Sequence, residues 1–465
     1  MNDEPTILAG RVFDGTEFID GPLEIKVRDG LILSIEPPSE AGSRAGAFLD
    51  ARDSLVMPGL INTHVHIARG GMFSANDPLS LRQVVRNFST TLAAGVTTVG
   101  EMGCSAGMAA AFREHTHAHP EAGPQVVACG PLLTVKGGYP LDWMPKPYAK
   151  LGVALSCETE EEGRANVRRV VEAGMNHVKL VSMHRSYADQ PIPTMSLPVA
   201  KAVVAEAHEH GRLVLTHAHT IEDYQLALDA GVDALMHSSF EPLETEMVER
   251  VAESGVFLCP TLWVFESVKT GVEFRWDADS RFTRFVSRKV ARDWTAFCDA
   301  YECSGDVLPP GIAGGLPKAR LQEAIEVPQE NLRLLREAGV PVVFGVDCNY
   351  GFAVLGRPVD ELLAMQRAGM SPVDCMIAAT SAAAAHLRCD DRGTLAPGKR
   401  ADLIVVPIKT ERDVGAIEYV RDVVAGGKLV GGDSLDRMAV DAGMAIAVIK
   451  GAARTAAQAI KRSRS

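Results

Sequence analysis

Residues 58–66 read PGLINTHVH, and this stretch decides the fold. The apolar run at 60–66 has strand character and closes on two histidines, His64 and His66. Side chains two residues apart in a strand point to the same side, so both imidazoles leave the strand together. In barrel enzymes the carboxyl ends of the strands hold the active site, and polar residues at such an end therefore indicate a catalytic position.

Seven further segments repeat the pattern of a short apolar strand, with amphipathic helical stretches between them. The segments lie at residues 96–102, 125–135, 177–182, 213–218, 234–239, 256–262 and 341–347. The helical stretches at 197–211 and 327–339 both end in glycine shortly before the next strand, which is a common helix stop. Strands that alternate with helices predict a parallel sheet, and eight of them close into a barrel. We therefore predict an α/β fold, a (β/α)8 TIM barrel over residues 59–395.

The two ends of the chain have a different sequence pattern. Residues 1–58 and 396–436 contain short alternating strands with Asp-Gly and Gly-Gly turns, which predict one small β-sandwich built from both chain ends. Residues 437–465 are expected to form a helical tail. A helical insert is expected at about 266–321, after the seventh strand, where it is either a lid over the active-site face or an outer packing element.

Composition narrows the functional classes. The 465 residues include 47 basic and 59 acidic side chains, so the net charge of −12 gives no reason to expect nucleic acid or an anionic membrane as a partner. No apolar run approaches the roughly 20 residues of a membrane span, and the N-terminus lacks the pattern of a secretory signal. Nine cysteines without a C-x-x-C pair are typical of reduced thiols. We expect a cytoplasmic protein that acts on a small molecule.

Four more polar residues lie at or near the carboxyl ends of otherwise apolar strands: Lys179, His217, His237 and Asp347. Burying such groups without partners would be costly, so their shared position indicates a common site. Neutral imidazoles and a carboxylate are metal ligands. Together with the first histidine pair, these residues predict a metal site at the mouth of the barrel.

The order of these motifs resembles the amidohydrolase superfamily. The resemblance rests on PGLINTHVH, the strand lysine, two histidines twenty residues apart, FGVD at 344–347, TSAAAAHL at 380–387 and GTLAPGKRADLIVV at 393–406. It covers almost the whole chain, including the split domain at its ends. Within the superfamily the chain is most similar to the binuclear, prolidase-like group, which includes Xaa-Pro dipeptidases, other metallocarboxypeptidases and ochratoxin-cleaving amidases.

The resemblance implies two divalent metal ions, with zinc expected from the nitrogen and oxygen ligands. The implied ligands are His64, His66, Lys179, His217, His237 and Asp347. The first two would share the more buried ion with Asp347, and His217 and His237 would hold the other. Lys179 would be carboxylated to N6-carboxylysine and bridge both ions. Asp347 would also serve as general base for a metal-activated hydroxide.

Two departures from the group concern the substrate. The third strand runs into VKGGYP with Tyr139, where the group commonly has a histidine, and His219 stands where the group often has a tyrosine. Tyr139, His219 and the nearby Lys136 are therefore candidates for substrate binding. His219 shares a strand face with His217, so the residues leave open which of the two is the ligand. The resemblance favours His217, because its spacing to His237 follows that of the group.

These features predict a binuclear, metal-dependent amidohydrolase that cleaves a C–N amide bond of an N-acyl amino acid or dipeptide-like small molecule. A lactone or carboxylic ester hydrolase is an alternative, because the same hydroxide attacks any activated carbonyl. A mononuclear deaminase is a weaker one, since that branch lacks the strand lysine and usually has glutamate where this chain has Thr220. A non-catalytic assembly protein would have lost ligands that are all present here. The resemblance also implies a homo-oligomer.

Overall fold

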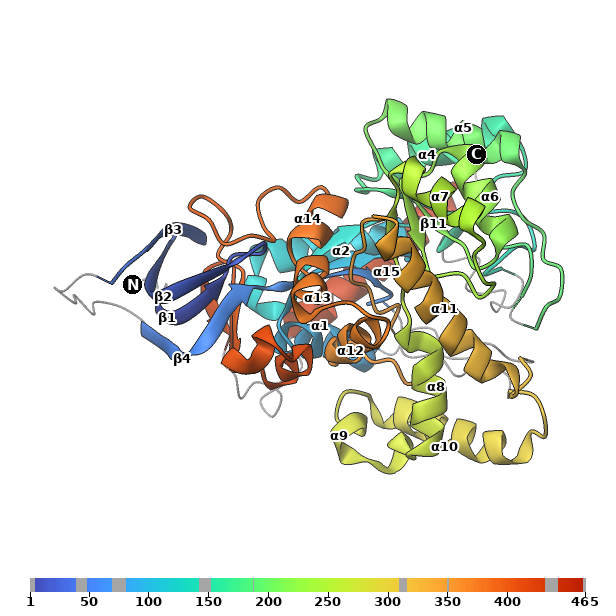
Figure 1. Cartoon of the computed structure of the whole chain (residues 1–465). Coiled ribbons are helices and arrows are strands. Elements are labelled where there is room, and N and C mark those ends of the chain that lie inside the picture. Colours follow the sequence, from blue (N-terminus) through green and yellow to red (C-terminus); the bar gives the residue numbers. More distant parts are fainter. Residues whose placement is uncertain are drawn as a thin grey trace.

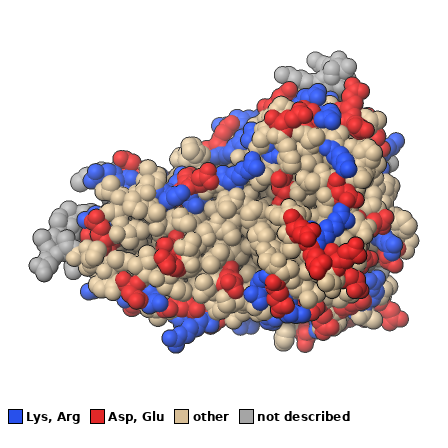
Figure 2. Space-filling view, turned by 45° about the horizontal axis from the view of Figure 1, so that its top comes forward, with Lys and Arg blue, Asp and Glu red and all other residues tan. Residues whose placement is uncertain are grey.

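The computed structural model describes residues 5–38, 48–68, 81–141, 152–186, 188–308, 316–348, 351–430 and 442–462. A β-rich end formed by the blue strands projects from a larger α/β body, and the helices α8, α9 and α10 extend from that body (Figure 1). Basic and acidic side chains are interspersed over the face shown in Figure 2. Among the described residues, no helix has both the length and the apolar character needed to cross a membrane.

Two parallel sheets form the α/β body. The three-stranded sheet consists of β5 (Leu60–Val65), β6 (Val96–Glu101) and β7 (Gln125–Ala128). The six-stranded sheet has the order β13-β12-β11-β10-β8-β9. Its strands are β8 (Leu132–Thr134), β9 (Ala154–Ser156), β10 (Val178–Val181), β11 (Val214–His217), β12 (Ala234–Met236) and β13 (Phe257–Cys259). The predicted third strand at 125–135 is thus divided into β7, in the three-stranded sheet, and β8, in the six-stranded sheet. This segment of the chain therefore connects the two sheets.

The predicted eighth strand joins the sheets on the other side. Residues 341–347 are not a regular strand, but their backbone bonds to both neighbours. The Val343 N–H donates to the Leu258 carbonyl on β13 (2.9 Å), and the Thr63 N–H on β5 donates to the Phe344 carbonyl (2.9 Å). The Asp347 N–H donates in turn to the His64 carbonyl at 2.8 Å. The eight predicted segments therefore follow one another in barrel order, and the predicted α/β fold is confirmed.

Helices cover the outside of this ring, and local signals set their ends. Thr220 and Asp223 form a capping box at the start of α6, and the left-handed Gly231 (φ 82°) ends that helix. The helices of the body are α1 (Leu81–Ala93), α2 (Ala106–Ala118), α4 (Glu160–Glu172), α5 (Leu197–Glu209), α6 (Ile221–Ala230), α7 (Thr245–Ser254), α11 (Arg320–Glu337), α12 (Val359–Arg367), α13 (Pro372–Ala378) and α14 (Ser381–His386). Short 3-10 helices span Pro120–Ala122, Ile408–Glu411 and Val414–Tyr419.

The ends of the chain combine in one seven-stranded sheet with the order β16-β15-β14-β4-β1-β2-β3. The strands are β1 (Thr6–Phe13), β2 (Phe18–Arg28), β3 (Leu31–Glu36), β4 (Phe48–Pro58), β14 (Leu403–Pro407), β15 (Asp422–Ala425) and β16 (Lys428–Val430). The antiparallel pairing of β4 with β14 unites the two ends, as predicted, although in one mixed sheet where the sequence predicted a small sandwich. Pro58 ends β4 two residues before β5 begins, so this sheet leads directly into the strand that carries the first histidine pair.

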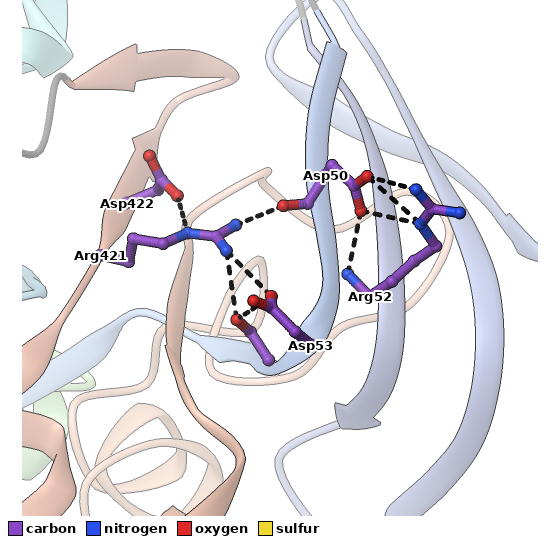
Figure 3. Close-up of polar contacts among 6 residues, drawn as sticks. Asp50, Arg52, Asp53, Arg421 and Asp422 are labelled. Atoms are coloured by element: carbon purple, nitrogen blue, oxygen red, sulfur yellow. Dashed lines mark hydrogen bonds and ion pairs between the residues drawn. The ribbon is translucent and has the colours of Figure 1, made fainter.

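A charged network ties β15 to β4 across the intervening β14 (Figure 3). The Arg421 guanidinium donates to the Asp422 carboxylate (2.7 Å), to the Asp53 carboxylate (3.1 Å) and to the backbone carbonyl of Asp50 (2.6 Å). Asp50 in turn accepts from Arg52 on the same strand. One side chain from the C-terminal part of the chain thus holds the last N-terminal strand.

The insert after β13 consists of α8 (Trp263–Glu273), a 3-10 turn (Trp276–Ala278), α9 (Ser280–Thr283) and α10 (Arg288–Cys303). Trp276 stacks on Phe282 with ring centroids 3.8 Å apart, and Trp294 packs against Phe352 at 4.9 Å. The Ser287 N–H donates to the Gln83 side chain on α1 at 2.5 Å. Most of the insert is therefore packed structure on the outside of the body.

The last described helix, α15 (Ala442–Arg462), packs along α2. Its buried residues include Met444, Ala447 and Val448. The hydroxyls of Thr455 and Ser105 are joined by a buried hydrogen bond of 2.7 Å. The expected helical tail is thus a helix whose inner face is part of the core.

Candidate active site

The six predicted ligands meet around one cavity. Its walls include His64, His66, Lys179, His217, His237 and Asp347. Each of these residues is between 1% and 8% exposed. They come from five segments of the ring (β5, β10, β11, β12 and residues 341–347), because parallel strands bring their carboxyl ends to the same face.

Asp347 is the centre of the first group of ligand atoms. Its Oδ1 lies 3.1 Å from His66 Nε2 and 3.6 Å from His64 Nε2, and its Oδ2 lies 3.8 Å from His237 Nδ1. One ligand atom from each of His64, His237 and Asp347 can be chosen so that all lie within 4.8 Å of one another. Such a spacing allows the three side chains to share one metal ion.

The second group consists of His217, His219 and His237, again with ligand atoms within 4.8 Å of one another. The ring centroids of His217 and His219 are 4.4 Å apart, and those of His219 and His237 are 4.5 Å apart. His217 lines the cavity that contains Lys179, whereas His219 lines a neighbouring cavity. His237 belongs to both groups and is their common member.

Lys179 is buried beside these residues without a hydrogen-bond partner for its Nζ in the described part of the chain. Burial lowers the pKa of Lys179 to about 8, because the cost of desolvating the ammonium outweighs the attraction of the Asp347 carboxylate. The neutral amine is therefore far more populated near neutral pH than in an ordinary lysine. The neutral amine is the form that reacts with carbon dioxide, so this environment suits the predicted carboxylation.

Burial also keeps the imidazoles neutral. It lowers the pKa of His64, His217 and His237 well below the ordinary value and that of His219 to about 4. Neutral imidazole is the metal-binding form, and its nitrogens need a partner when buried. Among the described residues, several buried atoms of the site have no hydrogen-bond partner: His64 Nδ1, His217 Nε2, His237 Nε2, Lys179 Nζ and Asp347 Oδ1. This set of orphaned donors and acceptors fits divalent metal ions.

Three neighbouring strand ends carry backbone strain. His237, Thr261 and Asp347 adopt positive φ angles of 96°, 49° and 48°, a region that side chains with a Cβ rarely occupy. Such conformations cost on the order of 1–3 kcal/mol each and cluster at functional sites. Here they turn His237 and Asp347 from their strands toward the shared cavity.

Two residues that the sequence analysis did not single out contact the predicted ligands. Thr261 Oγ1 and His237 Nδ1 are joined by a hydrogen bond of 2.7 Å, which leaves Nε2 for a metal. The Glu101 carboxylate accepts from the backbone N–H groups of Ile67 (2.6 Å) and Gly103 (3.2 Å) and lies 3.9 Å from His66 Nδ1. Glu101 was recognisable as an acidic residue near a strand end, but nothing in the local sequence singles out Thr261.

The three substrate-binding candidates are placed differently. The Tyr139 ring stacks on His217, with centroids 4.5 Å apart and planes 16° apart, and it lines the same cavity. His219 lines the neighbouring cavity together with Asp347. Lys136 is exposed and lines neither of these cavities, and its backbone N–H donates to Glu158. The structure therefore brings Tyr139 and His219, but not Lys136, to the site.

Known proteins are similar to this chain in sequence. The chain is 25% identical over 408 residues to the imidazolonepropionase of Salinispora arenicola (strain CNS-205), covering 83% of this chain and 88% of that protein. It is 37% identical over 106 residues to that of Geobacillus kaustophilus (strain HTA426), covering 22% and 25%.

Solved structures agree on the fold. A Xaa-Pro dipeptidase with bound methionine has a TM-score of 0.72 at 24% identity, over 92% of this chain and 100% of that one. The A. niger ochratoxinase has a TM-score of 0.70 at 21% identity, over 92% and 95%. Residues 55–430, well over half of the chain, match the amidohydrolase family. The protein therefore belongs to the amidohydrolase family and is a hydrolase.

Proposed function

We propose that this hydrolase cleaves the C–N amide bond of a small N-acyl amino acid or dipeptide-like compound with the help of two divalent ions, zinc being the expected metal. The observation that supports metal dependence is the convergence of buried, partnerless ligand atoms on one cavity. His64, His66 and Asp347 would hold one ion, His217 and His237 the other, and a carboxylated Lys179 would bridge them. Bound there, the ions would polarise the scissile carbonyl and lower the pKa of a water molecule toward neutrality.

The chain's own groups then perform the proton transfers and the positioning. Asp347 is the carboxylate at the centre of the histidines, so it accepts the proton of the attacking water and returns it to the leaving nitrogen. An amide nitrogen leaves only after protonation, which makes this second transfer essential. Tyr139 and His219 both contact the His217 ring, which supports a role for them in orienting the substrate.

A lactone or carboxylic ester hydrolase remains the second candidate, because a site that activates water attacks either carbonyl. Lys179 disfavours the mononuclear deaminase alternative, since the lysine lies inside the cavity with the histidines.

The test is a substrate panel with zinc-loaded enzyme. It contains N-acyl amino acids, dipeptides, carboxylic esters, lactones and imidazolonepropionate, the last taken from the name of the sequence relatives. We expect turnover of N-acyl amino acids or dipeptides that disappears with a chelator and returns with zinc. Turnover confined to lactones or esters, or to imidazolonepropionate, would overturn the proposed substrate class, and chelator-resistant turnover would overturn metal dependence.

A further inference from the structure

A second cavity adjoins the cavity that the six predicted ligands surround. It shares His237 and Asp347 with the first cavity and has an empty volume of ≈ 310 Å³, part of which is open solvent. Polar groups of His219, Ser238 and Thr261 lie in its walls together with those two residues. The remaining walls are apolar: Phe240, Pro260, Leu262, Val264, Phe265, Ala324 and Pro328.

The aromatic wall is ordered by ring contacts. Phe240 stacks on His219, with centroids 4.7 Å apart and planes 20° apart. Phe265 meets Phe240 edge to face at 4.9 Å and 81°. These contacts link the apolar wall directly to His219, whose ring also contacts those of His217 and His237.

The opposite wall is fixed by hydrogen bonds to α11. Ser238 Oγ donates to the Pro328 carbonyl at 2.9 Å. The Asn331 side-chain amide donates to the carbonyls of Ser239 and Glu241, both at 2.9 Å, and its oxygen accepts from the Leu243 N–H at 3.0 Å. The loop after β12 and helix α11 are thus held together by these hydrogen bonds.

The cavity continues outward. A third cavity shares Phe240, Phe265 and Ala324 with it and is also lined by Leu316, Arg320 and Glu323. Arg320 and Glu323 are exposed and form an ion pair at 3.4 Å. We call the second and third cavities together the apolar passage; its walls reach from His237 and Asp347 to the exposed Arg320 and Glu323.

We propose that this passage is a subsite for an apolar side chain, aromatic or branched, that flanks the scissile bond of the substrate. The inference rests on the proposed amide hydrolysis and adds the substrate class. Apolar walls gain affinity only from apolar groups, because a polar group buried there would lose its hydrogen bonds to water. The first turn of α8 and the Ala324 turn of α11 form the walls, so the insert contributes specificity through its first turn.

The test is a series of N-acyl amino acids in which the side chain grows from alanine through valine and leucine to phenylalanine. We expect kcat/KM of the wild type to rise by about 10- to 200-fold from alanine to phenylalanine, the usual range for filling an apolar pocket. Ala324→Phe fills the passage and should reduce this ratio to within a few-fold of one. Phe265→Ala, which removes a wall instead, should also lower the ratio.

The matched control is Ala338→Phe, the same substitution at the exposed C-cap of α11, which should retain both the activity and the ratio. A flat wild-type series, with amides still hydrolysed, would overturn the subsite and leave the proposed function intact. Binding gives a second readout independent of turnover: phenylacetate should bind the zinc-loaded wild type at least about tenfold more tightly than acetate, but not Ala324→Phe. Equal binding of both acids to the wild type would overturn the subsite even if no amide is cleaved.

Discussion

At the scale of single residues, Thr261 has the clearest consequence for metal binding. Its hydroxyl holds His237 Nδ1 at 2.7 Å, so the imidazole presents Nε2 to the cavity. Loss of such a supporting hydrogen bond typically lowers metal affinity about 10- to 100-fold. We expect this loss in Thr261→Val and not in Thr261→Ser, measured by competition with a zinc chelator. Wild-type affinity in the valine variant would show that the hydrogen bond does not orient the ligand.

Lys179 tests the binuclear proposal. Lys179→Ala removes the bridging group, so we expect loss of metal and activity, with partial recovery of both when small carboxylic acids are added. Metal content by mass spectrometry should be close to two ions per wild-type chain. Two ions retained in Lys179→Ala would contradict a bridging carbamate.

His217 and His219 lie within ring contact of each other, and metal content separates their roles. We expect His217→Ala to lose metal and His219→Ala to keep it and change the substrate kinetics. A raised KM with unchanged kcat would mark uniform substrate binding by His219, and equal losses in kcat and kcat/KM would mark a transition-state role. The reverse pattern of metal loss would exchange the two assignments.

Asp347 provides the most direct test of the proposed mechanism. Asp347→Asn keeps the shape and an oxygen ligand but removes the base, and general-base assistance is typically worth about 10² to 10⁴ in rate. We expect the variant to fold, to retain at least one metal and to lose roughly three or more orders of magnitude in kcat. The acidic limb of the pH–rate profile should vanish from the remaining activity. Near wild-type turnover with confirmed metal would move the proton transfer to another group, with His219 next in line.

At the scale of elements, the start of α8 donates two backbone hydrogen bonds to a buried carboxyl group. Glu361 on α12 accepts from the backbone N–H groups of Leu262 (2.9 Å) and Trp263 (2.7 Å), next to Thr261 and the apolar passage. Burial raises the pKa of Glu361 to about 8. The folded state therefore binds this proton more tightly than the unfolded chain. Its stabilising contribution is present below the ordinary glutamate pKa and is lost as the pH rises toward about 8.

The resulting prediction concerns thermal stability. The melting temperature of the wild type should fall between pH 5.5 and 8.5. The melting temperature of Glu361→Gln, whose side chain cannot ionise, should fall less over the same range. Scanning calorimetry of metal-loaded protein at both pH values measures the difference between the two slopes. Glu326→Gln, at an exposed site on α11, should keep the wild-type slope. Parallel slopes for all three proteins would show that Glu361 is already ionised across this range.

The elements also show how far sequence reasoning extends. Period and length were enough to find all eight barrel segments, because each is a short apolar run. The break between β7 and β8 had a local signal, since Gly130 and Pro131 interrupt the third segment and proline cannot donate to a ladder. Thr261 and Glu361 had no such signal. Their roles depend on contacts with residues 24 and 99 positions away in the chain, which no local pattern encodes.

At the scale of the whole molecule, the candidate site could be predicted from the sequence more completely than its surroundings. The six ligand candidates lie at strand ends, and the topology of a parallel ring brings strand ends together whatever the loops do. Lys136 was chosen by nearness in sequence to Tyr139, yet the turn between them directs it to the surface. The apolar passage was not foreseen, because it is assembled from three separate parts of the chain: the loop after β12, the start of α8 and the middle of α11.

The pairing of β4 with β14 has a consequence for synthesis on the ribosome. β4 is complete at residue 58, but its partner begins only at residue 403, and the clamp by Arg421 comes later still. At about 5–20 residues per second, the nascent chain carries the open edge of β4 for some tens of seconds. Unpaired strand edges can pair with other chains, so this edge of β4 is open to such pairing until β14 has been made.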